Sequence, residues 1–208
     1  MNLIRNLLAI IGLIAIIGGA FAYSKFSGMM TQMGDMDITA EKAALDQLDP
    51  KAKDVYMNMW TKLKETGNSA DATVVVYPVN DGVTPEQVEA AMKFKANELN
   101  IKGVGELPLS EQVKLETGKD QRFLKIYQFC NPQTAMKMVE YSDAFSAYLP
   151  CRIALIEDKQ GKLQLYALDM DMMIHGGKTL PPELLEEAQG VQQIILGIMQ
   201  QGATGEEF

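Results

Sequence analysis

Two cysteines, Cys130 and Cys151, are the only thiols in this 208-residue chain, and each lies within two residues of a proline. The segments RFLKIYQFC and CRIALIED, which end and begin at these cysteines, are rich in β-branched and aromatic residues and are predicted strands. Residues 133–146 between them have a helical pattern. If this helix is a simple excursion from a sheet, the two strands run as neighbours and the thiols meet at one edge.

A disulfide between Cys130 and Cys151 would close a loop of about twenty residues and stabilise the domain by ~3 kcal/mol in an oxidising compartment. Pro132 and Pro150 would fix where the chain leaves and re-enters the sheet, with Asn131 and Arg152 beside them. Two alternatives remain open: independent buried thiols, and a metal or redox role. A reactive thiol needs nearby positive charge, for which Arg152 and Lys125 are candidates.

The segment LDMDMMIHGGK gathers Met170, Met172, Met173 and the only histidine, His175, at the predicted end of the last strand. Thiolate, thioether and imidazole are ligand types that select copper(I). A candidate metal set is therefore Cys130, Cys151, Met173 and His175. The competing interpretation is that the methionines fill the core and that His175 caps a turn before Gly176. No cofactor is predicted, and copper is kept as the alternative.

Catalytic signatures are weak elsewhere. Asp169 and Asp171 would share one face of a strand, which is ordinary alternation. No serine lies in a glycine-flanked elbow, and Gly176-Gly177-Lys178 lacks the spacing of a phosphate loop. The chain is therefore not expected to be an enzyme, and no catalytic residue is predicted.

The amino terminus is typical of a membrane-directed segment. Arg5 precedes an uncharged run from Leu7 to Tyr23, and Lys25 follows it. Seventeen residues span roughly 25 Å as a helix, so the run predicts a signal anchor that holds the rest of the chain in the periplasm, at the bacterial inner membrane. Ala20-Phe21-Ala22 also fits a signal-peptidase site, and the alternative is a soluble periplasmic protein cleaved near Ala22.

The remaining elements predict one α+β domain. Residues 27–70 are interpreted as a spacer that carries a helix from Pro50 to Gly67, which either packs on the domain or binds a membrane surface or partner. Residues 71–201 give the order β-α-β-β-(α)-β-β-α, which favours a two-layer fold with a mostly antiparallel sheet covered on one face by helices. Residues 202–208 form an acidic tail.

The elements CNP and LPCR, followed by the acidic turn EDKQGK, resemble the family of domain of unknown function 302 over about residues 72–200. The resemblance implies a TATA-binding-protein-like β-α-β(4)-α fold, with residues 133–146 as a helical insertion. It implies no reaction.

Net charge also limits the partners. The formal charge is −8, and since Arg5 is the only charged residue before Tyr23, the exported part is more acidic still. Such a domain repels phosphate backbones, which argues against nucleic-acid binding. We expect a membrane-tethered domain that binds a small ligand or a protein partner, and a homodimer is compatible with the sequence. The alternative is an envelope thiol-redox or copper-handling protein that uses Cys130, Cys151 and His175.

Overall fold

The computed structural model describes residues 38–207 of the chain, which divides into two compact units, residues 1–47 and 48–208. In the first unit the structure describes one helix, α2 (Ile38–Leu45). The predicted anchor, residues 1–26, lies outside the described residues. Within residues 38–207, no helix combines the length and the apolar character needed to cross a bilayer.

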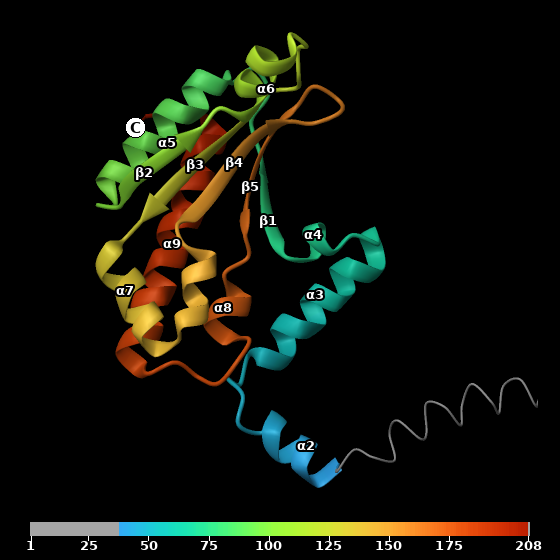
Figure 1. Ribbon diagram of the computed structural model, residues 1–208, viewed down its shortest axis with the longest axis vertical. Helices are drawn as coiled ribbons and strands as arrows, with labels where there is room; N and C mark the ends of the chain where they lie inside the picture. The colour runs from blue at the N-terminus through green and yellow to red at the C-terminus, as the bar shows by residue number, and fades with distance from the viewer. Residues whose placement is uncertain (1–37, 208) are drawn as a thin grey trace, which may run out of the picture. The chain divides into compact units, whose positions relative to one another are not determined.

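The second unit is built on a five-stranded sheet in the order β1-β5-β4-β3-β2, with every neighbouring pair antiparallel. Figure 1 shows that helices cover one face of this sheet. The predicted α+β class with an antiparallel sheet is therefore confirmed. The strands are β1 (Val74–Pro78), β2 (Lys102–Leu107), β3 (Leu124–Cys130), β4 (Cys151–Glu157) and β5 (Leu163–Leu168).

Two long helices, α5 (Pro85–Glu98) and α9 (Pro182–Thr204), pack against each other and against the sheet (Figure 1). The predicted capping box starts α5: Thr84 Oγ1 accepts from the Gln87 N–H, and Gln87 Oε1 accepts from the Thr84 N–H. The apolar stripe predicted for the last helix is buried on α9, through Leu184, Ala188, Val191, Ile195, Ile198 and Met199.

The core lies between these helices and the sheet. Its largest fully buried side chains include Tyr127, Met92, Leu155 and Ile198. The helices approach closely at Gly202 of α9, where an added Cβ would lie 2.6 Å from Met92 Cγ and 3.2 Å from Leu165 Cδ1. A side chain at this position would have to displace core atoms.

A charged cluster ties α5 to the edge of the sheet. Lys125 Nζ on β3 lies 2.7 Å from Glu89 Oε2 and 2.7 Å from Glu106 Oε2, and the Tyr127 hydroxyl donates to Glu89 at 2.8 Å. Lys93 pairs with both carboxylates as well. Each charge in the cluster therefore has an opposite partner, although the group is only partly exposed to water.

Strand β2 forms an edge and carries a bulge. Gly103 pairs with Phe129 and Gly105 with Gln128, so Val104 is an extra residue without a partner on β3. An added Cβ at Gly105 would lie 2.7 Å from Gln128 Oε1, so the Gln128 side chain would have to move to make room for it. The sequence predicts this segment only as a weak strand, because two of its six residues are glycines.

Between strands, the chain adds helical segments that differ in part from the prediction. The helix expected over residues 133–146 is a short helix α7 (Pro132–Tyr141) followed by a 3-10 helix η1 (Asp143–Tyr148). Helix α6 (Leu109–Thr117) was not predicted, since none of its residues is buried. The predicted end of the last strand is instead helix α8 (Asp171–His175).

Preceding the sheet, α3 (Ala52–Thr66) ends at Gly67 as predicted, and α4 (Ser69–Ala72) leads into β1. The Tyr56 hydroxyl donates to the Gly176 carbonyl at 2.7 Å, so α3 packs beside α8. Its other side is open: Met57 is 50% and Trp60 53% exposed. Packing on the domain is thus observed, while binding of a membrane or partner by the exposed side stays a prediction.

Candidate functional site

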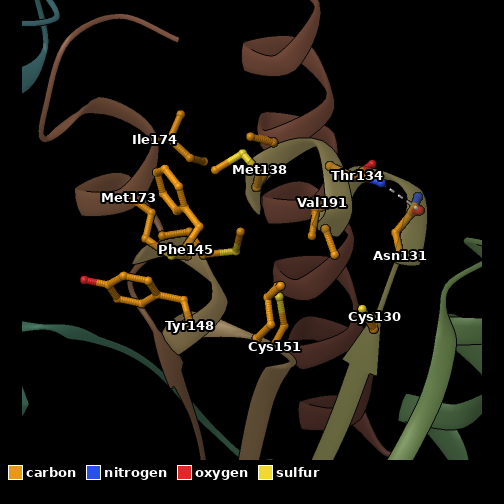
Figure 2. Close-up of a pocket in the computed structure, with 14 residues that line it drawn as sticks. Cys130, Asn131, Thr134, Met138, Phe145, Tyr148, Cys151, Met173, Ile174 and Val191 are labelled. Carbon is orange, nitrogen blue, oxygen red and sulfur yellow. Dashed lines mark hydrogen bonds between the residues drawn. The ribbon is translucent and has the colours of Figure 1, made fainter. Parts of the chain in front are cut away.

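A narrow pocket lies where β3 ends and β4 begins, beneath α7 and η1 and against α9 (Figure 2). Its volume is about 50 Å³. Since one water needs roughly 10–15 Å³ of such space, the pocket holds only a few atoms. Its lining consists of Cys130, Asn131, Thr134, Ala135, Met138, Phe145, Tyr148, Leu149, Cys151, Met170, Met173, Ile174, Ala188 and Val191.

Sulfur is the distinctive element of this lining. Five of the lining side chains end in or contain sulfur: Cys130, Cys151, Met138, Met170 and Met173. Two of the three polar oxygen-bearing side chains in the lining are already engaged, because Asn131 Oδ1 accepts from backbone N–H groups of α7 and Thr134 Oγ1 donates to Glu187. The sulfur atoms are therefore the main groups available to a ligand in the pocket.

Local sequence explains how the lining is assembled. Asn131 caps α7 and Pro132 occupies its first turn, so the chain turns into a helix directly after Cys130. It returns through η1 and a cis Leu149-Pro150 bond to Cys151. The 20 intervening residues thus fold over the strand ends as a roof.

Cys130 and Cys151 both line the pocket, but the predicted disulfide between them is not formed: both are free thiols in the structure. The register explains this. Cys151 stands opposite Phe129, so Cys130 lies one residue beyond the end of the ladder between β3 and β4. The Cβ atoms are therefore not set opposite each other as a bridge across the two strands requires.

Burial makes both thiols harder to ionise. Burial raises the pKa of Cys130. Burial, with a smaller contribution from Cys130, raises the pKa of Cys151 to about 11, and the nearby charge of Arg152 lowers it by less. The second predicted source of positive charge, Lys125, is paired with Glu89 and Glu106. The geometry does not favour a reactive thiolate.

His175 belongs to a different arrangement from the cysteines. It is 5% exposed, its Nδ1 lies 3.2 Å from Asp49 Oδ1, and its Nε2 lies 3.5 Å from the Gln189 amide nitrogen. Met173 of the predicted metal set lines the pocket, but His175 does not. Among the described residues, no group of three or more His, Cys, Asp or Glu side chains could hold a metal ion.

Asp49 is itself buried and carries a negative charge. Burial alone would raise the pKa of Asp49, but hydrogen bonds from the Lys51 N–H, Thr179 and His175 outweigh it and lower the pKa. This pair joins residues 126 positions apart and fixes the start of α3 to the end of α8. No pattern in the sequence pointed to it.

Two open grooves flank α3 next to the pocket. One of about 320 Å³ is lined by Met59, Met172 and Met173 among others, and one of about 350 Å³ by Tyr56, Phe145 and Met172 among others. Tyr148 and Met173 line both grooves and the sulfur pocket. The three cavities are therefore neighbours that share these two side chains.

Of the remaining predicted site residues, Arg152 is exposed and pairs with Gln128 across the strands, and Pro132 is exposed at the start of α7. Sequence reasoning missed Met138, Phe145 and Tyr148 as lining residues, and it named Met170 only as one of the methionines gathered before His175. The available signal was the spacing of Met138 from Thr134, which puts both on the buried face of one helix.

Comparison with known protein families finds a match to this domain. A family model described as "Domain of unknown function DUF302" matches residues 75–202, which is more than half of the chain. The chain belongs to the DUF302 family. The match begins in β1 and ends in α9, so it spans the whole sheet, and the DUF302 domain contains the sulfur pocket.

A solved structure, "Crystal structure of uncharacterized conserved protein DUF302 from Bacillus stearothermophilus", is similar with a TM-score of 0.49 and 16% sequence identity. The similarity covers 62% of this chain and 97% of that chain. No curated protein was matched.

Proposed function

We propose that this DUF302 protein is a membrane-tethered, periplasm-facing domain that binds a small ligand in the pocket at the end of the sheet. One observation carries the proposal: a narrow, largely apolar pocket with five sulfur-containing side chains in its lining. Concave sites with few available polar groups are typical of ligand binding.

Binding is favoured over catalysis by the chemistry of the lining. The fourteen lining residues include no carboxylate, imidazole or amine. General acid–base chemistry requires such a group within hydrogen-bond reach of the reacting atom. Both thiols have raised pKa values because of burial, so neither is prepared as a nucleophile.

The proposed tether rests on the sequence before residue 27. Arg5, the uncharged run from Leu7 to Tyr23, and Lys25 together favour a segment that inserts with its amino terminus inside. A phosphatase reporter fused after Phe208 should be active in the periplasm, and amino-terminal sequencing should show whether the chain is retained whole or cleaved near Ala22. A reporter active only in the cytoplasm would contradict the proposed location.

Ligand binding is tested by native mass spectrometry of the full chain released from its own membranes. We expect one small additional mass per chain, together with the oligomeric state. Ala135→Leu should fill the pocket and remove that mass, whereas Ala70→Leu on the exposed surface of α4 should keep it. Absence of any added mass in the wild-type chain, or its survival in Ala135→Leu, would overturn the assignment of the pocket.

A further inference from the structure

We propose that the ligand of this pocket is a soft monovalent metal ion, Cu(I), held by Cys130, Cys151 and the thioethers of Met170 and Met173. This inference rests on the proposed function in taking the pocket as the ligand site. It departs from the set expected from the sequence, because His175 is replaced by a second thioether.

The sulfur atoms in the lining favour a soft metal ion. Thiolate and thioether sulfur select Cu(I), whereas carboxylate, carbonyl and water oxygens select Mg²⁺, Ca²⁺ and Mn²⁺. The pocket offers five sulfur side chains and no carboxylate. Figure 2 shows Cys130 and Cys151 on the strand ends, with Met173 and Met138 across the pocket from them.

The size and polarity of the pocket also favour a single metal ion. A volume of about 50 Å³ accommodates a single ion or a few atoms, far less than the roughly 300–1,000 Å³ typical of organic ligands. The surroundings are apolar, with Phe145, Ile174 and Val191 in the lining. A buried charge there is costly unless it is compensated.

Charge balance favours a monovalent ion. When Cu(I) binds, at least one thiol loses its proton to solvent as a copper–sulfur bond forms, and no electron is transferred. One thiolate with Cu(I) gives a neutral centre, and thioethers add ligands without adding charge. A divalent ion would need both thiolates to reach neutrality and would find no carboxylate or imidazole in the lining.

His175 is excluded by its contacts. Both ring nitrogens face other partners, Nδ1 toward Asp49 and Nε2 toward Gln189, and the side chain is nearly fully buried among them. Recruiting it would break the pair that fixes α3 to α8.

A path of thioethers leads to the site. Met59 and Met172 line the open groove beside α3, and Met173 lines both that groove and the pocket. Met173 therefore connects a groove lined by thioethers with the pocket that contains the cysteines.

The experiment is an anaerobic titration of the full chain in detergent with Cu(I), using Ag(I) as an analogue that undergoes no redox change. We expect one equivalent bound per chain and an all-sulfur first coordination shell by X-ray absorption. Cys130→Ser with Cys151→Ser should abolish binding, and Met170→Leu with Met173→Leu should weaken it at least tenfold. Met136→Leu, on the exposed side of α7, should bind as the wild type does, and circular dichroism checks the fold of each variant.

Several outcomes would overturn the inference. Binding that survives loss of both cysteines, or a shell that contains nitrogen, places the metal elsewhere. If Cu(I) and Ag(I) do not bind while native mass spectrometry shows another mass that Ala135→Leu removes, the metal is wrong and the proposed binding function stands. If neither a metal nor any other mass occupies the pocket, both fall.

Discussion

At the residue scale, the two thiols decide how the pocket is interpreted. The loop length and strand order suggested a disulfide, yet the register offsets Cys130 from Cys151 by one residue. Side-chain direction in a strand alternates with every residue, so an error of one position in register changes which groups face each other. The sequence specifies both strands well, but the register between them depends on the connecting segment, which leaves no clear mark in the sequence.

The first prediction follows from that geometry. The unreduced, denatured chain should yield two free thiols by alkylation and mass spectrometry, because neither cysteine has a bonded partner in the structure. A reduced sample serves as the control and should give the same count. A chain that gains two alkyl groups only after reduction would contradict the free thiols.

Glu89 provides a pH prediction. Burial raises the pKa of Glu89, but hydrogen bonds from Lys125, Lys93 and Tyr127 outweigh it and lower the pKa from 4.5 to about 2. A carboxyl whose pKa is lowered on folding stabilises the fold fully at a pH above its unfolded-state pKa. This stabilisation is lost as the pH falls through its folded-state pKa.

We therefore expect Glu89→Gln to reduce the free energy of unfolding at pH 7 by about 1–3 kcal/mol, since Lys125 loses a partner. The difference from wild type should shrink as the pH falls from 4.5 to about 2. Urea unfolding followed by circular dichroism measures both. Glu116→Gln, on the exposed helix α6, should change little, and a Glu89→Gln effect that does not vary with pH would rule out the electrostatic explanation.

At the element scale, the contact between α5 and α9 depends on one glycine. Gly202→Ala should reduce the free energy of unfolding by about 1–3 kcal/mol, because the new methyl group meets Met92 and Leu165 in a filled core. Gly190 on the same helix has no atom within 4 Å of an added Cβ, so Gly190→Ala should instead stabilise by about 0.5–1 kcal/mol. Thermal unfolding of the two variants gives opposite shifts if the packing is as described, and equal shifts would contradict it.

Elements with a buried face were predictable. The capping box before α5 and the apolar stripe of α9 identify both helices, and runs of apolar and aromatic residues identify β1, β3, β4 and β5. Helix α6 escaped prediction because it buries no residue and therefore shows no apolar periodicity. Helix α8 was not predicted because its five residues are too few to show a helical period and to distinguish a helical turn from the end of a strand.

The site was predictable only in part for a similar reason. Cys130, Cys151 and Met173 could be selected by residue type, and all three line the pocket. The Asp49–His175 pair could not, because a contact between residues 126 positions apart depends on the completed fold. The lone histidine therefore suggested a metal ligand where the structure has a hydrogen-bonded pair.

At the scale of the whole molecule, this pair governs how the segment before the sheet is held. Asp49→Ala would leave His175 buried without its carboxylate partner, at a cost of about 1–3 kcal/mol. We expect faster hydrogen exchange in α3, with smaller changes in the strands, since α3 packs mainly on α4 and α8. The exposed Asp54→Ala on the same helix is the matched control. Unchanged exchange in α3 of Asp49→Ala would show that the pair does not hold this helix.

The bulge in β2 also determines how the sheet meets other chains. Val104 interrupts the backbone ladder at one edge, and Lys102 and Glu106 place charges along it. At the other edge, Lys62 Nζ donates to the Val74 carbonyl of β1, and Pro78 at the end of that strand has no N–H to offer. Neither edge thus provides an uninterrupted row of backbone donors and acceptors with which a strand of a second chain could pair. Growth into intermolecular β-aggregates is therefore hindered even where many copies are crowded together.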